Sequence, residues 1–270
     1  MLQEIGSLLW ERKDFFAGLV LEHLQISLLA ILIAIVIGGI FGLFISEFQK
    51  AAKPALGAVN FLYTIPSISM LGFLIPFSGV GNATAVIALT VYALLPMVRN
   101  TYTGMTNVDS AILEAAKGMG STRLQILFKI RLPLAMPVIM SGIRSMVTMT
   151  IALAGIASFI GAGGLGVAIY RGITTNQGAM TMAGSLLTAL LALLLDFIER
   201  RMTKRSARAK RTNRFLGLAG LLLCLLAILA AALSSRKGET IHIATKPMTE
   251  QYVLGEMLDI LIEQDTDLEV

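Results

Sequence analysis

The sequence has very little of what soluble proteins and metal sites are made from. Charged residues are 14% of the 270 residues, whereas hydrophobic residues are 56%. Cys224 is the only cysteine, which excludes an internal disulfide and a cysteine-built metal site. The two histidines, His23 and His242, lie far apart, so each is expected to be an interfacial or strand residue and not a metal ligand. A soluble domain cannot bury this much apolar surface, so the composition predicts a protein in a lipid bilayer.

Uncharged stretches long enough to cross a bilayer recur along the chain. A helix needs about 20 apolar residues to cross a hydrocarbon core about 30 Å thick. The uncharged stretch 54–98 is right for two helices, broken at the glycine-rich turn 77–82. The other four predicted spans are 24–46, 135–160, 178–198 and 215–233. Segment 1–22 has helical apolar spacing but too many charges to cross, so it is expected to lie flat at the membrane interface.

Lysine and arginine are distributed unevenly between the two sides of these spans. If the N-terminus is outside, the segments 47–53, 99–133 and 199–214 face the cytoplasm and carry 2, 5 and 8 of these residues. Six lie in the outside segments, and Arg144 lies within a span. Because cytoplasmic loops carry an excess of basic residues, this orientation is favoured. The charged island between the third and fourth spans is therefore predicted to face the cytoplasm.

This island has the signals of two short helices. Asp109 or Ser110 can cap the first helix, and the glycines of 118–120 can end it. A Thr-x-x-Gln capping box at Thr122 predicts the start of the second, and Pro133 is expected to stop it. The predicted apolar faces hold Ile112, Ala115, Ala116 and Met119 in the first helix, and Leu124, Leu127 and Phe128 in the second. A loop that only joined two spans would need no such features, so a docking surface for a cytoplasmic partner is favoured.

The island also resembles the EAA-x3-G-x9-I-x-L-P signature of permease subunits of bacterial ATP-binding-cassette (ABC) importers. The matching residues are Glu114, Ala115, Ala116, Gly120, Ile130, Leu132 and Pro133. In that family this element is the coupling helix, which sits in a groove of the ATPase subunit. The resemblance implies an all-α polytopic membrane protein with a type I importer transmembrane domain over 23–200. It also implies a homodimer with two separate cytoplasmic ATPase chains, which hold the ATP and magnesium.

Two further stretches resemble the osmoprotectant, or quaternary-amine, branch of these permeases. They are 63–67 and 159–166, and the resemblance implies a role in the pathway or gate for Thr64, Pro66, Ser67, Gly161, Gly163, Gly164 and Gly166. Three of these glycines also fit G-x-G-x-x-G, but the dinucleotide fingerprint requires a βαβ unit and here the motif follows a membrane span. The sequence has no G-x4-G-K-[ST] motif, so another chain must hydrolyse ATP. We expect this chain to have no catalytic residue and to bind no cofactor, metal or nucleic acid.

The residue composition of the C-terminal part of the chain changes after the basic linker 201–214. A sixth span, 215–235, is expected to tether the segment 239–270 outside the cell. That segment resembles the start of solute-binding proteins of the same branch, which are α/β domains, and about 30 residues are too few for a core, so the domain is expected to continue. The candidate substrate-binding residues are Lys246, Met248, Thr249 and Glu250. Met248 stands where the family has an aromatic residue, which points to an ergothioneine-type solute.

Three interpretations of function remain from the sequence, together with an open role for Arg144. The favoured one is the permease of a bacterial plasma-membrane importer for a quaternary amine such as ergothioneine, glycine betaine, carnitine or choline. The alternatives are a membrane-anchored receptor that transports nothing and an ABC permease for an amino acid. An intramembrane arginine is a functional-site candidate by default. The other interpretation of Arg144 is that it snorkels to the cytoplasmic interface or pairs with a nearby carbonyl.

Overall fold

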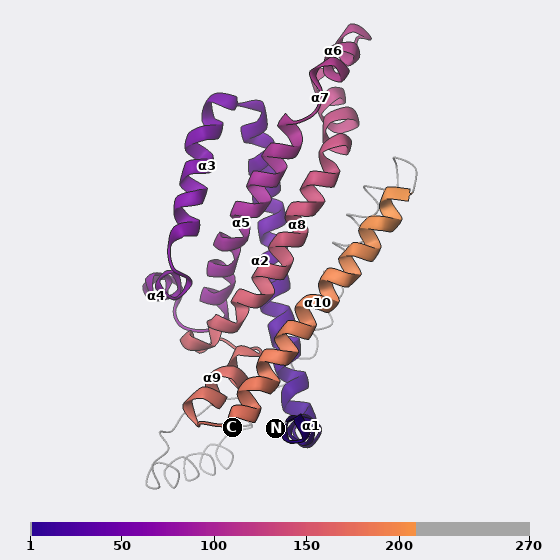
Figure 1. The fold of residues 1–270 in the computed structure, drawn as a ribbon. Coiled ribbons are helices and arrows are strands. Elements are labelled where there is room, and N and C mark those ends of the chain that lie inside the picture. The colour runs from indigo at the N-terminus through magenta and orange to yellow at the C-terminus, as the bar shows by residue number, and fades with distance from the viewer. Residues whose placement is uncertain (1, 209–270) are drawn as a thin grey trace, which may run out of the picture. The chain divides into compact units, whose positions relative to one another are not determined.

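The structure, a computed structural model, describes residues 2–208, and every regular element in that range is a helix (Figure 1). The α-helices are α1 (Leu2–Glu11), α2 (Lys13–Glu47), α3 (Gln49–Thr64), α4 (Ser67–Ser78), α5 (Asn82–Thr106), α6 (Ser110–Gly118), α7 (Arg123–Ile126), α8 (Leu132–Ala154), α9 (Gly166–Thr174) and α10 (Gly178–Arg208). A π-helix, η1 (Leu127–Arg131), joins α7 to α8, and a 3₁₀-helix, η2 (Gly155–Ile160), follows α8. Cys224, His242, the predicted sixth span and the predicted outer domain lie outside the described residues.

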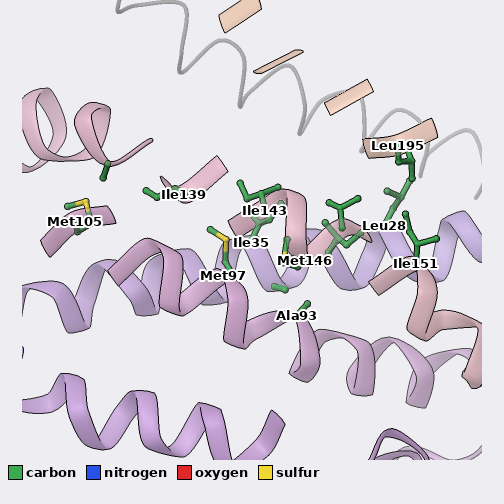
Figure 2. Close-up of a cluster of buried hydrophobic side chains, with 14 residues drawn as sticks. Leu28, Ile35, Ala93, Met97, Met105, Ile139, Ile143, Met146, Ile151 and Leu195 are labelled. Carbon is green, nitrogen blue, oxygen red and sulfur yellow. The ribbon is translucent and has the colours of Figure 1, made fainter. Parts of the chain in front are cut away.

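Helices α2, α5 and α8 form the centre of the described bundle and lie side by side (Figure 1). Their facing side chains form one buried cluster, which includes Ile35 of α2, Met97 of α5 and Ile143 of α8 (Figure 2). The helices approach closely where glycine faces a partner: a Cβ added to Gly42 of α2 would lie 2.6 Å from Cβ of Thr101 in α5. Small residues serve this purpose in membranes, because helices in lipid associate through close packing and not through hydrophobic exclusion.

Four described helical segments are long and apolar enough to cross a membrane. They are Lys13–Glu47, Asn82–Thr106, Arg123–Ile160 and Gly178–Arg201, and they contain the predicted first, third, fourth and fifth spans. The prediction of an all-α polytopic protein is therefore confirmed. The N-terminal boundary differs from the expectation, because residues 13–22 are the start of α2 and only 2–11 form a separate helix. Ile5 of that helix is buried against Leu165 and Met180.

The predicted second span is not one straight helix. The pair α3 and α4 is bent by 97° at a short break. The break falls at Ile65 and Pro66, where Ile65 takes an extended conformation with φ −66° and ψ 129°. The α region is disfavoured for a residue that precedes proline, and Ile65 takes the extended alternative, whereas Pro54, Pro76 and Pro96 lie inside helices. The chain therefore turns inside a stretch whose composition alone would allow a continuous span.

Candidate coupling and gating sites

The charged island folds as the predicted pair of short helices, the α6–α7 hairpin. The Asp109 carboxylate accepts a hydrogen bond of 2.9 Å from the Ala111 amide, so Asp109 and not Ser110 caps α6. At α7 the Gln125 amide donates to the Thr122 hydroxyl at 3.3 Å, and the Thr122 amide donates to the Gln125 side chain at 3.0 Å. This reciprocal pair is the predicted capping box, which satisfies two amides that a helix start leaves open. Both caps are confirmed.

Gly120 sets the turn between the two helices. Its φ is +79°, a conformation that costs other residues energy but not glycine. Its amide donates to the carbonyl of Lys117, and the Ser121 amide donates to the carbonyl of Ala116, at 2.9 and 3.1 Å. This is the Schellman arrangement, in which a left-handed residue after the helix returns the chain and satisfies the last carbonyls. Gly118, by contrast, is the last residue of α6 and has no positive φ.

The hairpin presents an apolar surface, which we define as Ile112, Met119, Leu124 and Phe128. Their exposed fractions are 44, 79, 68 and 52%. Leu127 was expected on this surface, but it packs against the central cluster instead, and Ala116 is also buried. The Glu114 carboxylate and Ala115 are exposed. An exposed apolar patch of this kind on a short, capped element is typical of a docking surface.

The remaining signature residues join the hairpin to the bundle. Ile130 and Leu132 are half-buried, Leu132 packs against the central cluster, and Pro133 is buried. The expectation that Pro133 stops a helix is wrong, because the chain continues through η1 into α8 and Pro133 lies in the first turn of α8. The Leu132 amide just before it donates to the Leu127 carbonyl five residues back, so the helix passes this proline with π-helical spacing. The hairpin is therefore continuous with α8, which belongs to a helical segment long and apolar enough to cross a membrane.

Arg131, at the variable position of the signature, was not singled out from the sequence. Its Nε and Nη2 atoms donate to the carbonyl of Met105, at 3.3 and 3.0 Å, and its Nη1 atom pairs with the Glu47 carboxylate. Met105 lies in the last turn of α5, and Glu47 is the last residue of α2. No local pattern could have revealed these partners, because they are 26 and 84 residues away along the chain.

The stretch Thr64, Pro66 and Ser67 forms the break between α3 and α4. The Tyr92 hydroxyl of α5 donates to the carbonyl of Ile65 within this break. Tyr92 and Tyr63 also make an edge-to-face contact, with ring centroids 5.9 Å apart. The extended backbone at Ile65 exposes a carbonyl to which no helix amide is directed, and the tyrosine hydroxyl satisfies it. Thr64 and Pro66 are exposed, and Ser67 is half-buried.

The glycine-rich loop 161–166 packs against two other helices. The Gly163 amide donates to the Asn82 side chain of α5 at 2.9 Å, and the Gly164 amide donates to the Glu22 carboxylate of α2 at 3.0 Å. Gly161 and Gly164 have φ values of +72° and +96°. Glycine therefore supplies both the left-handed turns and the close approach, as the sequence predicted for a tightly turned loop.

Two contacts place this loop in the fold. A Cβ added to Gly164 would lie 3.1 Å from the backbone and ring of His23. His23 lies in α2 and is fully buried, and its Nε2 atom lies 2.9 Å from the carbonyl oxygen of Ile151, so it is not a strand residue. The preceding η2 packs against α4, which brings the loop and the α3–α4 break together. The α6–α7 hairpin lies at the opposite end of the bundle (Figure 1).

Arg144 pairs with an acidic side chain and not with a carbonyl. Its Nε atom lies 3.7 Å from the Asp196 carboxylate of α10, which also accepts from Arg200 at 2.7 Å. Glu199, one turn further along α10, is buried. An intramembrane charge is costly alone, so pairing across α8 and α10 offsets its desolvation. Asp196 and Glu199 are visible in the sequence as acidic residues at the end of an otherwise apolar stretch, but no local pattern indicates that Arg144 is the partner.

Arg144→Met is expected to destabilise the assembled protein more than it alters the choice of solute. The substitution leaves the Asp196 carboxylate without one partner, and because the pair is partly exposed we expect a loss of about 1–2 kcal/mol, less than for a fully buried pair. Thermal unfolding of the detergent-solubilised protein measures this. The double variant Arg144→Met/Asp196→Leu should recover much of the loss. Wild-type stability combined with altered solute selection would contradict a structural role.

No group of three or more histidine, cysteine or carboxylate side chains among residues 2–208 is placed to hold a metal ion. What the described residues offer is a docking hairpin at one end and a glycine-rich loop beside a helix break at the other.

The family of binding-protein-dependent transport system inner membrane components matches residues 26–211. The chain belongs to this family. It is 37% identical over 246 residues to an ergothioneine transport permease/ergothioneine binding protein of Helicobacter pylori, covering 86% of this chain and 44% of that protein. The chain thus spans less than half the length of this relative.

Two shorter relatives are matched over most of their length. A carnitine transport permease of Listeria monocytogenes is 39% identical over 70% of this chain and 89% of its own. An osmoprotectant import permease of Salmonella typhimurium is 42% identical over 71% of this chain and 92% of its own. Among solved structures, the inward-facing MetNI methionine ABC transporter has a TM-score of 0.65 at 24% identity, covering 70% of this chain and 95% of the matched chain. That similarity shows the fold of a type I ABC importer transmembrane domain.

Proposed function

We propose that this chain is the permease subunit of a bacterial ABC importer for a quaternary-ammonium or betaine-type solute, such as ergothioneine, glycine betaine, carnitine or choline. The α6–α7 hairpin carries the proposal. It is capped at both helices, exposes an apolar surface and is continuous through η1 with the central helix α8. A separate ATPase that docks on this surface can move α8. An importer needs such a connection between the ATPase and its membrane helices, whereas a membrane anchor does not need it.

The solute class rests on the relatives and on the tail. The relatives are named for ergothioneine, carnitine and osmoprotectants. A match over 86% of this chain must include residues beyond 208, whereas the matches to the two shorter permeases cover 70 and 71%. The name of the first relative, which joins a permease and a binding protein, supports a solute-binding domain that begins in segment 239–270, is tethered outside the cell by 215–235 and uses Lys246, Met248, Thr249 and Glu250. An amino acid permease remains the alternative that a solute panel excludes or supports.

The proposed assembly is a homodimer with two cytoplasmic ATPase subunits, which hold ATP and magnesium. Each chain carries one signature hairpin, so a pair of ATPases needs two permease chains. With the N-terminus outside, the hairpin faces the cytoplasm and the glycine-rich loop faces outward. Thr64, Pro66, Ser67, Gly161, Gly163, Gly164 and Gly166 would then lie at the outer gate of the pathway. Native mass measurement of the purified complex tests the stoichiometry, and one permease chain per assembly would overturn it.

Uptake in whole cells tests the proposed solute class. The full-length protein is expressed with its partner ATPase, in bacteria that lack osmoprotectant uptake. Labelled ergothioneine, glycine betaine, carnitine, choline and methionine are supplied separately. Accumulation of one of the first four supports the proposal, and accumulation of methionine alone supports an amino acid permease. Ligand binding at the cell surface without accumulation of any solute indicates a receptor.

Glu114→Ala is expected to lower coupled uptake while the protein still inserts into the membrane. The Glu114 carboxylate is exposed on the hairpin, so alone it contributes little to stability. In the docked complex the Glu114 carboxylate would pair with a basic group of the ATPase groove and be desolvated. Removal of one partner of such a pair costs about 2–5 kcal/mol of binding free energy. Uptake per inserted protein measures the effect, and ligand binding by the outer domain is the control that should not change. Equal uptake by wild type and variant would show that Glu114 is only a solvated charge.

A further inference from the structure

Arg131, the last residue of η1, connects the segment that follows the α6–α7 hairpin to α2, a helix that the chain does not join to the hairpin directly, and to the end of α5. The hairpin is joined covalently to α5 through residues 107–109 and to α8 through η1. It buries few side chains of its own, since Ala116 is the buried residue of α6 and Ile126 that of α7. Movement of α5 and α8 alone would shear them past α2, which shares their central cluster. A further attachment, to α2, is therefore needed if the three helices are to move together.

The Arg131 junction, which we define as Arg131, Glu47 and the Met105 carbonyl oxygen, provides that attachment. The guanidinium is largely buried, with 15% of the side chain exposed, and it uses three nitrogen atoms on two helices. The last carbonyls of a helix have no intrahelical donor and carry the negative end of its dipole. The Met105 carbonyl therefore attracts a cation, and the planar guanidinium reaches this oxygen and the Glu47 carboxylate at once.

We propose that Arg131 is a positioning residue that transmits movement of the hairpin to α2, in addition to α5 and α8, which the chain joins to the hairpin. The proposal rests on the proposed importer function. Arg131 is the last residue of η1, a π-helix over 127–131, and π-helical segments are frequent at functional sites. Without the junction, the ATPase still docks on the exposed surface of the hairpin, and ATP is still hydrolysed. The helices that form the pathway no longer follow, so fewer solute molecules cross for each ATP consumed.

The first experiment measures solute transported per ATP hydrolysed in proteoliposomes that contain the full-length chain and its ATPase. The labelled solutes are ergothioneine, glycine betaine, carnitine and choline, supplied together. For Arg131→Met we expect the ratio to fall at least about fivefold, with ATPase binding retained. Glu47→Gln removes only the ion pair from a half-exposed position and should give a smaller fall. Lys53→Met, which removes an exposed cytoplasmic charge, is the matched control and should keep the wild-type ratio.

The second experiment needs neither solute nor transport. Nitroxide labels are attached at Lys50→Cys in α3 and Lys117→Cys in α6, in a Cys224→Ser background diluted with unlabelled protein in nanodiscs. The wild-type junction should give one narrow distance distribution, and Arg131→Met should broaden it. Unchanged ratios of solute transported to ATP hydrolysed in Arg131→Met and Glu47→Gln, or an unchanged distance distribution in Arg131→Met, would overturn the proposed role of the Arg131 junction. A wild-type protein that transports none of the four solutes, yet shows the broadening, would instead overturn the proposed solute class.

Discussion

Gly166→Ala is expected to abolish solute uptake and to reduce the yield of folded protein. A Cβ at this position would lie 2.1 Å from the backbone carbonyl oxygen of Gly155, well inside the 3.4 Å at which ordinary contact begins. The obstructing atom belongs to the backbone of η2, so it cannot rotate away as a side chain does. Overpacking of this kind costs about 1–3 kcal/mol. Here the displacement also separates α9 from η2 and withdraws the glycine-rich loop from Glu22 and Asn82.

Gly155→Ala is the matched control for this prediction. It places a methyl group on the other partner of the same contact, but an added Cβ there has no neighbour within 4 Å. The two variants therefore add the same methyl group on opposite sides of the contact between η2 and α9. Uptake per inserted protein and thermal stability are measured for both. Loss in Gly166→Ala alone supports the close approach of η2 and α9, and equal behaviour of the two variants would contradict it.

Gly120→Val is expected to prevent the ATPase from binding. The turn needs a φ of +79°, which is strained for any residue with a side chain and most of all for a β-branched one. The strain costs roughly 1–3 kcal/mol, and the hairpin escapes it by abandoning the turn. Met119 and Leu124, on either side, would then no longer form one surface. Co-purification of the ATPase with the tagged permease measures the loss, while ligand binding by the outer domain stays unchanged.

Gly118→Val provides the comparison within the same segment. Gly118 is helical, has no positive φ and has open space around its Cβ position. The added side chain is the same, so only the backbone conformation differs between the two sites. ATPase binding close to the wild-type level is expected for Gly118→Val. If the two variants lose ATPase binding equally, the loss is caused by the added bulk on the hairpin and not by the strained turn.

The features that could be predicted from the sequence are those that depend on near neighbours. The Asp109 cap, the capping box at Thr122 and the glycine turn were all predictable, because each motif joins residues only two to five positions apart. The spans were predictable for a similar reason, since hydrophobic length is a local property. The bend between α3 and α4 had a local signal in Pro66, but composition favoured one continuous span.

The features that could not be predicted depend on partners distant along the chain. Arg131 meets Glu47 across 84 residues, and Arg144 meets Asp196 of a different helix. Hydrophobic periodicity indicates which face of a helix is apolar but not which helix covers it. Leu127 illustrates this, because its spacing suits the exposed surface of the hairpin and the structure buries it against the bundle. The long-range pairs that attach the hairpin to the bundle therefore came from the structure alone.

The central claim is that the α6–α7 hairpin couples ATP hydrolysis by a separate subunit to movement of solute through this chain. The most direct test is uptake of the four labelled solutes into proteoliposomes that contain the full-length protein and its ATPase, with and without ATP, for wild type and Gly120→Val. The claim predicts ATP-dependent uptake by wild type and none above background by Gly120→Val. ATP-dependent uptake by Gly120→Val at the wild-type rate, or no uptake by a wild-type complex that binds both solute and ATPase, would contradict it.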